Sequence, residues 1–120
     1  MKLNHDAVRF ILLTIEIEIG NDKRVENTYF HNKGYNNSEV DYAIKLLYDE
    51  EYIEGVDIST LGAYGYKIFG LKWKGHDLLD NIRDDGVWKE TKSKAARVGS
   101  ASLNILSQIA IAVITARITQ

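Results

Sequence analysis

The first regular pattern along the chain is a run of apolar residues at spacings of three and four. The run contains Val8, Ile11, Leu12, Ile15 and Ile19. Because this spacing places side chains on one face of an α-helix, it predicts an amphipathic helix over residues 5–18. Asn4 precedes the helix as an N-cap, and Gly20-Asn21-Asp22 provides a stop signal after it.

A short strand and a second helix are predicted next. Residues 24–30, RVENTYF, are rich in β-branched and aromatic residues, which favours a strand. Asn36, Asn37 and Ser38 then offer caps for a helix, and Ser38 with Asp41 three residues later approximates a capping box. The apolar stripe of this helix consists of Val40, Ile44, Leu47 and Tyr48.

A glycine-rich stretch separates two extended segments in the middle of the chain. Tyr52-Ile53-Glu54-Gly55 leaves the second helix, and residues 66–71, YKIFGL, form the second arm of a predicted hairpin. The loop of this hairpin covers residues 58–66. From Trp73 the helical period returns and predicts one long helix to about Lys92, which Gly86 would weaken or bend.

The last segment, residues 100–118, is apolar nearly all round. A helix of this kind is normally buried, and a chain of 120 residues has little room to enclose it. Self-association is therefore the simplest expectation. The alternative is that this helix spans a membrane. The polar residues Asn104, Ser107 and Gln108 lie inside the segment and disfavour a membrane span. The residues expected at a protein interface are Leu103, Leu106, Ile109, Ala110, Val113 and Ile114.

The order of these elements predicts an α+β fold. Helix, short strand, helix, hairpin and long helix over residues 1–95 follow the order of a winged-helix-like domain, and residues 96–120 add the apolar C-terminal helix as an oligomerisation element. In such a domain the second helix occupies the recognition position, and the loop of the hairpin is the wing.

Composition and charge narrow the function classes. The chain has no cysteine, which excludes a disulfide framework and thiol catalysis; without an N-terminal signal peptide, a cytoplasmic location is expected. A formal net charge of −2 gives no global attraction to nucleic acid. Charge is nevertheless uneven, because residues 36–54 are strongly acidic with Lys45 as the single basic residue, whereas residues 89–97 are basic.

Three segments of the chain carry a family resemblance: MKLNHDAVRFILLTIE, NNSEVDYAIKLLYDEEYIEG and GLKWKGHDLLDNIRDDGVWKETK. They span about residues 1–95 and resemble a domain-of-unknown-function family found in phages, prophages and their bacterial hosts. The resemblance implies a winged-helix-like fold and a mobile-element context, with no established biochemistry. The chain has Lys72 where the family pattern has threonine, which removes an expected helix cap, and Ala43 where histidine is frequent.

Two His-Asp pairs, His5-Asp6 and His76-Asp77, invite comparison with metal-dependent phosphohydrolases. Such a site needs several nitrogen and oxygen ligands around one metal ion. Both pairs lie at predicted helix starts, where aspartate favours the helix dipole without a metal, and His31 has no partner at ligand spacing. Motifs of other catalytic sites are absent. We therefore expect neither an enzyme nor a metal or cofactor site, unless the two helix starts meet in space.

DNA binding is the function that the predicted fold suggests first, with the protein acting as a dimeric regulator. The expected contact residues are Asn36, Asn37, Ser38, Tyr42 and Lys45 on the second helix, and Lys67, Lys72 and Lys74 on the wing and its flank. The acidic residues of the same helix would, however, repel phosphate.

The alternative is a protein-binding accessory factor, an adaptor or an inhibitor of a host or phage protein. The acidic helix has Tyr35, Tyr42, Tyr48 and Tyr52 nearby, and aromatic residues are enriched at protein contacts. An acidic surface can also imitate the charge of nucleic acid. The same tyrosines are equally explained as residues at the edge of the core. The sequence leaves both functions open.

Overall fold

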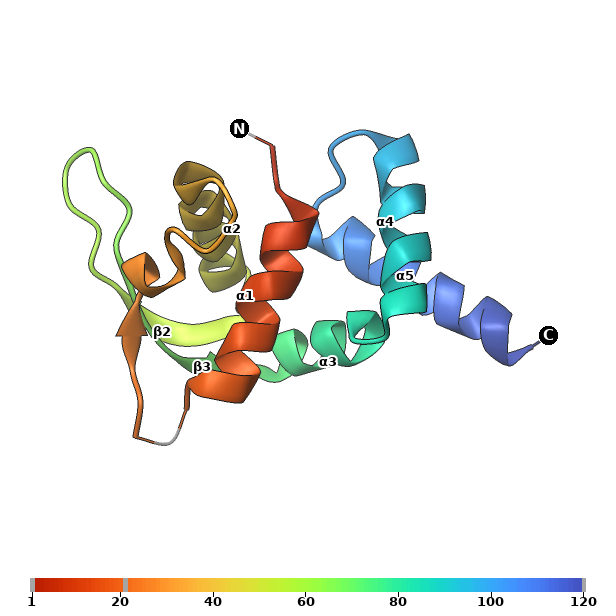
Figure 1. Ribbon diagram of the computed structural model, residues 1–120, viewed down its shortest axis with the longest axis horizontal. Coiled ribbons are helices and arrows are strands. Elements are labelled where there is room, and N and C mark those ends of the chain that lie inside the picture. Colours follow the sequence, from red (N-terminus) through yellow and green to blue (C-terminus); the bar gives the residue numbers. More distant parts are fainter. Residues whose placement is uncertain (1, 21, 120) are drawn as a thin grey trace.

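The computed structural model describes residues 2–20 and 22–119, which form helices and a small antiparallel sheet (Figure 1). The helices are α1 (His5–Glu18), the 3₁₀ helix η1 (Asn27–Phe30), α2 (Asn37–Asp49), α3 (Trp73–Ile82), α4 (Asp85–Val98) and α5 (Leu103–Ile118). The strands are β1 (Val25–Glu26), β2 (Ile53–Asp57) and β3 (Tyr66–Leu71). The predicted α+β class is confirmed. The loop between β2 and β3 and the end of α5 lie at opposite ends of the molecule (Figure 1).

Helix α1 lies at the centre of the core and has the bounds that its apolar period predicts. Its core face is at most 1% exposed and consists of Ala7, Val8, Ile11, Leu12 and Ile15. The predicted cap is also confirmed, because the side-chain oxygen of Asn4 accepts a hydrogen bond from the N–H of Ala7 at 3.0 Å. Helices α2 and α3 and strand β3 all pack against α1.

Strand β3 is the central strand of the sheet, which has the order β1-β3-β2 with both pairs antiparallel. The predicted hairpin is present as β2 and β3. A bulge lies between Glu54 and Gly55. A Cβ atom at Gly55 would lie 2.2 Å from the carbonyl oxygen of Lys67, so only glycine fits this position.

The strand predicted over residues 24–30 is correct only at Val25 and Glu26, where the chain pairs with β3. At the next position the side chain of Asn27, and not its backbone, accepts the hydrogen bond from the N–H of Tyr66, at 3.1 Å. The ladder ends there because a side-chain oxygen has replaced the backbone acceptor, and the chain continues as η1.

The cap of α2 also differs from its prediction. Asn36 is the N-cap, and its side-chain oxygen accepts from the N–H of Glu39 at 3.0 Å. Ser38 and Asp41 do not form the predicted capping box. The Asp41 carboxylate instead accepts hydrogen bonds from residues that precede the helix.

The single long helix predicted from Trp73 to about Lys92 is wrong, since α3 ends at Ile82 and α4 begins at Asp85. The guanidinium of Arg9, on α1, donates to the carbonyl oxygens of Ile82 at 2.9 Å and of Arg83 at 2.7 Å. These bonds satisfy carbonyl groups that the end of α3 leaves free. The break is therefore stabilised from a distant helix.

The start of α4 is stabilised locally. The Asp84 carboxylate caps this helix by accepting from the N–H of Val87 at 2.9 Å. Gly86 lies within the first turn of α4, beyond the break, so it does not bend a continuous helix as predicted. Lys72, where the family pattern has threonine, precedes α3 without making a side-chain cap.

Helix α5 packs within its own chain, against α3 and α4. Four of the six residues predicted at an interface with a second copy are buried there without exposed surface: Leu103, Leu106, Ala110 and Val113. In this structure these four side chains are covered by their own chain, against α3 and α4. Self-association through α5 stays a prediction. Ile109 and Ile114 are half-buried.

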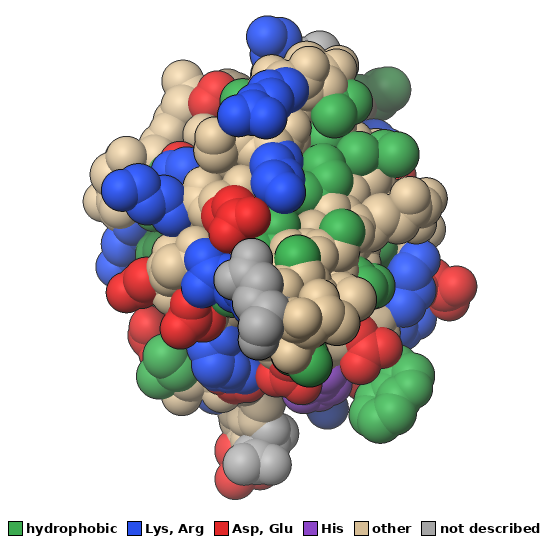
Figure 2. All heavy atoms as spheres, turned by 90° about the vertical axis from the view of Figure 1, so that its right-hand side faces the viewer, with side chains coloured by type: hydrophobic (Ala, Val, Ile, Leu, Met, Phe, Trp, Pro, Cys, Tyr) green, Lys and Arg blue, Asp and Glu red, His purple; other side chains and the backbone are tan. Residues whose placement is uncertain are grey.

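The outer side of α5 remains exposed at Ile111 and Ile118. Figure 2 shows hydrophobic side chains scattered over this end of the molecule, beside Lys and Arg side chains. Among the helices of residues 2–20 and 22–119, none is long and apolar enough to cross a membrane.

Packing of α5 within the chain predicts different costs for two similar substitutions. Leu106→Ala should lower the free energy of unfolding by about 2–5 kcal/mol, because it opens a cavity in a buried contact. Ile111→Ala, on the exposed side of the same helix, should lower it by less than about 1 kcal/mol. Urea unfolding followed by circular dichroism measures both. Equal costs, or a larger cost at Ile111, would contradict packing in cis.

Candidate functional site

An open groove of about 500 Å³ lies between the C-terminal half of α2 and the loop of the hairpin. Helix α2 contributes Lys45 and Asp49 to its lining, and β3 contributes Tyr66. The remaining lining residues come from the end of β2 and from the loop, namely Asp57, Ser59, Thr60, Gly62, Ala63 and Tyr64. The groove thus depends on how the hairpin is held against α2.

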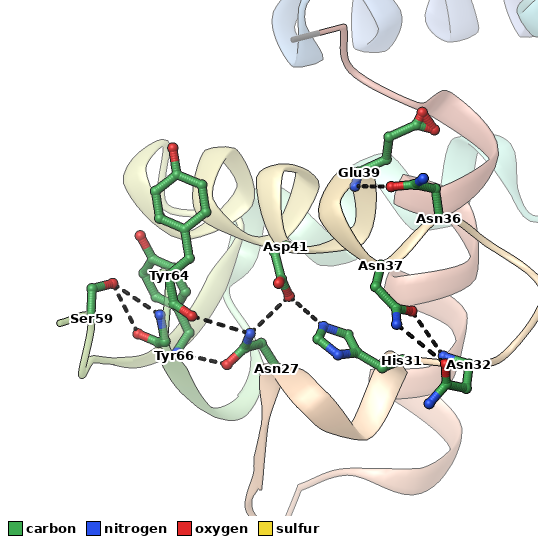
Figure 3. A network of polar contacts seen from close by, with 11 residues as sticks. Asn27, His31, Asn32, Asn36, Asn37, Glu39, Asp41, Ser59, Tyr64 and Tyr66 are labelled. Atoms are coloured by element: carbon green, nitrogen blue, oxygen red, sulfur yellow. Dashed lines mark hydrogen bonds and ion pairs between the residues drawn. The ribbon is translucent and has the colours of Figure 1, made fainter. Parts of the chain in front are cut away.

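A buried amide, that of Asn27, connects the hairpin to α2 (Figure 3). Asn27 is 4% exposed, and its oxygen accepts from the N–H of Tyr66 at 3.1 Å. Its nitrogen donates to the carboxylate of Asp41 on α2 at 2.8 Å and to the carbonyl oxygen of Tyr64 at 3.5 Å. One side chain at the start of η1 therefore joins the end of the hairpin loop, the start of β3 and α2.

Asp41 has a second partner, His31, whose Nε2 lies 2.7 Å from the same carboxylate oxygen. Both side chains are about one-fifth exposed. Sequence reasoning missed this pair, because a separation of ten residues across a turn is not a recognised spacing. The contact supports Asp41 from the side opposite Asn27 (Figure 3).

The loop is ordered by its own hydrogen bonds. The Ser59 hydroxyl accepts from the N–H of Gly65 at 3.0 Å, and the N–H of Ile58 donates to the Gly65 carbonyl oxygen at 2.8 Å. Nearer the tip, the backbones of Thr60 and Ala63 pair with each other at 3.1 Å. These bonds keep the two arms of the loop together beyond the strands.

The charged groups of the groove are two carboxylates and one ammonium. Lys45 Nζ lies 2.5 Å from the Asp49 carboxylate, and this hydrogen bond raises the pKa of Lys45. Hydrogen bonds from Ser59 lower the pKa of Asp57. Both pKa shifts favour the charged forms, of Lys45 and of Asp57. With two carboxylates against one ammonium, the formal charge of the groove is negative.

The residues predicted to contact DNA do not share one surface. Asn36 and Asn37 are engaged in hydrogen bonds at the start of α2, Asn37 with Asn32, while Ser38 is exposed beside them. Tyr42 lines a different cavity, together with Lys2, Leu46 and Ser102. Of the predicted residues on α2, Lys45 alone lies in the groove.

The three lysines predicted on the wing and its flank lie elsewhere. Lys67 is exposed on β3 between its cross-strand partners Glu26 and Val56. Lys72 pairs with Glu51 at 3.6 Å, and Lys74 donates to the carbonyl oxygen of Glu50 at 3.0 Å. Lys72 and Lys74 are thus next to the C-terminal end of α2, opposite Asn36 and Asn37.

The tyrosines near α2 serve the core more than the surface. Tyr52 is 3% exposed, Tyr35 stacks on Phe10 with ring centroids 4.8 Å apart, and Tyr48 packs beside Tyr66. Besides residues such as Ile17 on α1 and Trp73 on α3, the exposed apolar side chains include four on the hairpin: Val56, Ile58, Leu61 and Tyr64. Sequence reasoning missed these four, although apolar residues in a glycine-rich loop were a usable signal.

The two His-Asp pairs do not form a metal site. His5 Nε2 lies 2.8 Å from the carbonyl oxygen of Ala101, and Asp6 accepts from Trp88 Nε1 at 3.2 Å and Lys92 Nζ at 3.1 Å. His76 and Asp77 are exposed on α3. Over the described ranges, no three His, Asp or Glu side chains are placed to hold a metal ion.

These features define a small α+β domain with an acidic groove between a helix and a hairpin. A family model described as hypothetical protein, DUF2513, matches residues 2–102, and the chain belongs to this family. The resemblance to a domain-of-unknown-function family is thereby confirmed. An uncharacterized protein of Haemophilus influenzae strain Rd is 34% identical over 116 residues, which cover 96% of this chain and 97% of that protein. No solved structure matches the chain.

The role of Asn27 predicts a measurable loss of stability. Asn27→Ala should lower the free energy of unfolding by about 1–3 kcal/mol, because it leaves the buried N–H of Tyr66 without its acceptor. Asn104→Ala, at an exposed position of α5, is the matched control and should change it by less than about 0.5 kcal/mol. Urea unfolding of the two variants measures both changes. Equal urea midpoints for Asn27→Ala and Asn104→Ala would exclude the proposed role of Asn27.

Proposed function

We propose that the protein is a protein-binding accessory factor that contacts its partner with the hairpin loop and the groove beside α2. The observation that carries this proposal is the group of exposed apolar side chains on the hairpin: Val56, Ile58, Leu61 and Tyr64. Leu61 is fully exposed at the loop tip. Four exposed apolar side chains within residues 56–64 of one hairpin favour a contact with another macromolecule there.

Charge favours a protein over duplex DNA at this surface. Lys45, the basic residue that lines the groove, is paired with Asp49, and Asp57 adds a further carboxylate. A DNA backbone carries one negative charge per phosphate and needs unpaired Lys or Arg side chains to neutralise it. An apolar loop next to an acidic groove suits a protein partner that carries apolar and basic groups.

We further propose a winged-helix fold and a role for a phage or prophage in the cytoplasm. The element order α1, β1, α2, β2, β3 and the sheet order β1-β3-β2 support the winged helix, with α2 at the recognition position and the β2–β3 loop as the wing. The family resemblance of the three sequence segments supports the mobile-element context. Use of the wing for a protein contact is consistent with such a fold, because a fold does not determine function.

DNA binding by a dimer is the second candidate. It is favoured by the same element order and by the exposed basic residues Lys89, Lys94 and Arg97 on α4. A dimer would use the outer side of α5, at Ile111 and Ile118, since the inner side is covered. In this arrangement the DNA contact would involve α4 as well as α2.

A capture experiment with matched variants tests the proposal. The full chain is immobilised, incubated with lysate of the organism that encodes it, and bound proteins are identified by mass spectrometry. Wild type should retain a partner that Ile58→Ser/Leu61→Ser/Tyr64→Ser loses. Ile17→Ser/Trp73→Ser removes exposed apolar side chains away from the hairpin and should retain it.

DNA binding is tested by titrating a labelled random DNA duplex with the protein at low salt. We expect no binding. Equal capture by the hairpin variant and wild type would contradict the proposal. Duplex binding that weakens steeply with salt, by a log-log slope of about −0.9 per neutralised phosphate, would favour the second candidate instead.

A further inference from the structure

We propose that the groove between α2 and the hairpin receives an arginine side chain from a basic segment of the partner protein. This inference rests on the proposed function and adds the chemistry of the partner. It starts from the groove lining, which combines two carboxylates, of Asp49 and Asp57, with the aromatic residues Tyr64 and Tyr66. Carboxylates and aromatic faces together are the groups that hold guanidinium and ammonium ions.

The groove already holds one cation of its own chain, the Lys45 ammonium. The Lys45 ammonium lies 2.5 Å from a carboxylate oxygen of Asp49 and 6.0 Å from the centroid of the Tyr64 ring. The carboxylate comes from α2 and the ring from the hairpin loop, so the cation bridges the two elements. A partner's side chain would enter beside Lys45 or displace it.

Asp57 supplies the charge for a second cation. Its carboxylate accepts from the N–H of Ser59 at 2.8 Å, and within the described part of the chain it forms no ion pair. With Lys45 neutralising Asp49, one negative charge remains at the groove. Charge complementarity therefore calls for one basic side chain of the partner.

The surroundings of the groove favour arginine within an apolar segment. Tyr64 is a little under half exposed, so one part of it remains open to a ligand. A planar guanidinium can stack on such a ring while it donates two hydrogen bonds to a carboxylate, which an ammonium cannot do in the same way. Ile58 and Leu61 lie on the same loop and offer contacts to apolar neighbours of the arginine.

A nuclear magnetic resonance titration of the ¹⁵N-labelled full chain tests this inference. The probe is the blocked peptide Gly-Leu-Arg-Leu-Gly, and the matched control replaces its arginine by citrulline, which has nearly the same shape and no charge. The arginine peptide should shift the amide signals of Asp57, Ser59 and Tyr64 in a saturable way. The citrulline peptide should bind at least about twofold more weakly, in line with the strength of an exposed ion pair.

Peptide binding by three variants tests whether the groove attracts positive charge. Asp57→Asn should weaken binding about two- to fivefold, whereas Asp77→Asn, at an exposed carboxylate on α3, should leave it unchanged. Lys45→Met should strengthen binding, because it removes the competing ammonium and frees Asp49. A groove that bound phosphate would respond in the opposite direction.

The other possible results either contradict the inference or distinguish it from the proposed function. Equal binding of the two peptides, or weaker binding by Lys45→Met, overturns the inference. So do shifts at these amides that depend on protein concentration alone, since they would assign the groove to a second copy. If the arginine peptide fails while the hairpin still captures a protein, this inference is wrong and the proposed function stands. If hairpin-dependent capture also fails, both are wrong.

Discussion

The buried amide of Asn27 is the interaction on which the arrangement of the binding surface depends. Its oxygen terminates the pairing of β1 by taking the N–H of Tyr66, and its nitrogen reaches Asp41 on α2 and the backbone of Tyr64. Because the amide is buried, leaving these groups unpaired would be costly. The hairpin is thereby fixed against α2, and the groove between them acquires a definite shape.

The other helices pack into one hydrophobic core with the elements that carry this surface. Arg9 joins α1 to the junction of α3 and α4 through two backbone carbonyl groups. That junction turns α4 so that α5 can pack on α3 and α4 in the same chain. The apolar C-terminal helix, which suggested a dimer from the sequence, therefore completes the core of one chain and leaves Ile111 and Ile118 outside.

Features determined by neighbouring residues were predictable, and features determined by distant ones were not. The bounds of α1 and its Asn4 cap follow from local periodicity and capping, and both were confirmed. The break after Ile82 was missed because Arg9, more than seventy residues earlier, stabilises it. The groove was found only in part: Lys45 was predicted, but Asp57 and Tyr64 join it through the fold of the hairpin. No periodic pattern marks such a contact, since it depends on the buried side chain of Asn27.

The most direct test of this account is native-state amide hydrogen exchange at Tyr66 in wild type and in Asn27→Ala. In wild type the Tyr66 amide should exchange slowly, like that of Ile11 in the centre of α1, because its acceptor is buried. In the variant, exchange at Tyr66 should accelerate at least about tenfold more than at Ile11, since the hairpin opens without unfolding of the whole chain. Equal acceleration at the two amides would show that Asn27 contributes only to global stability and would contradict its role in fixing the groove.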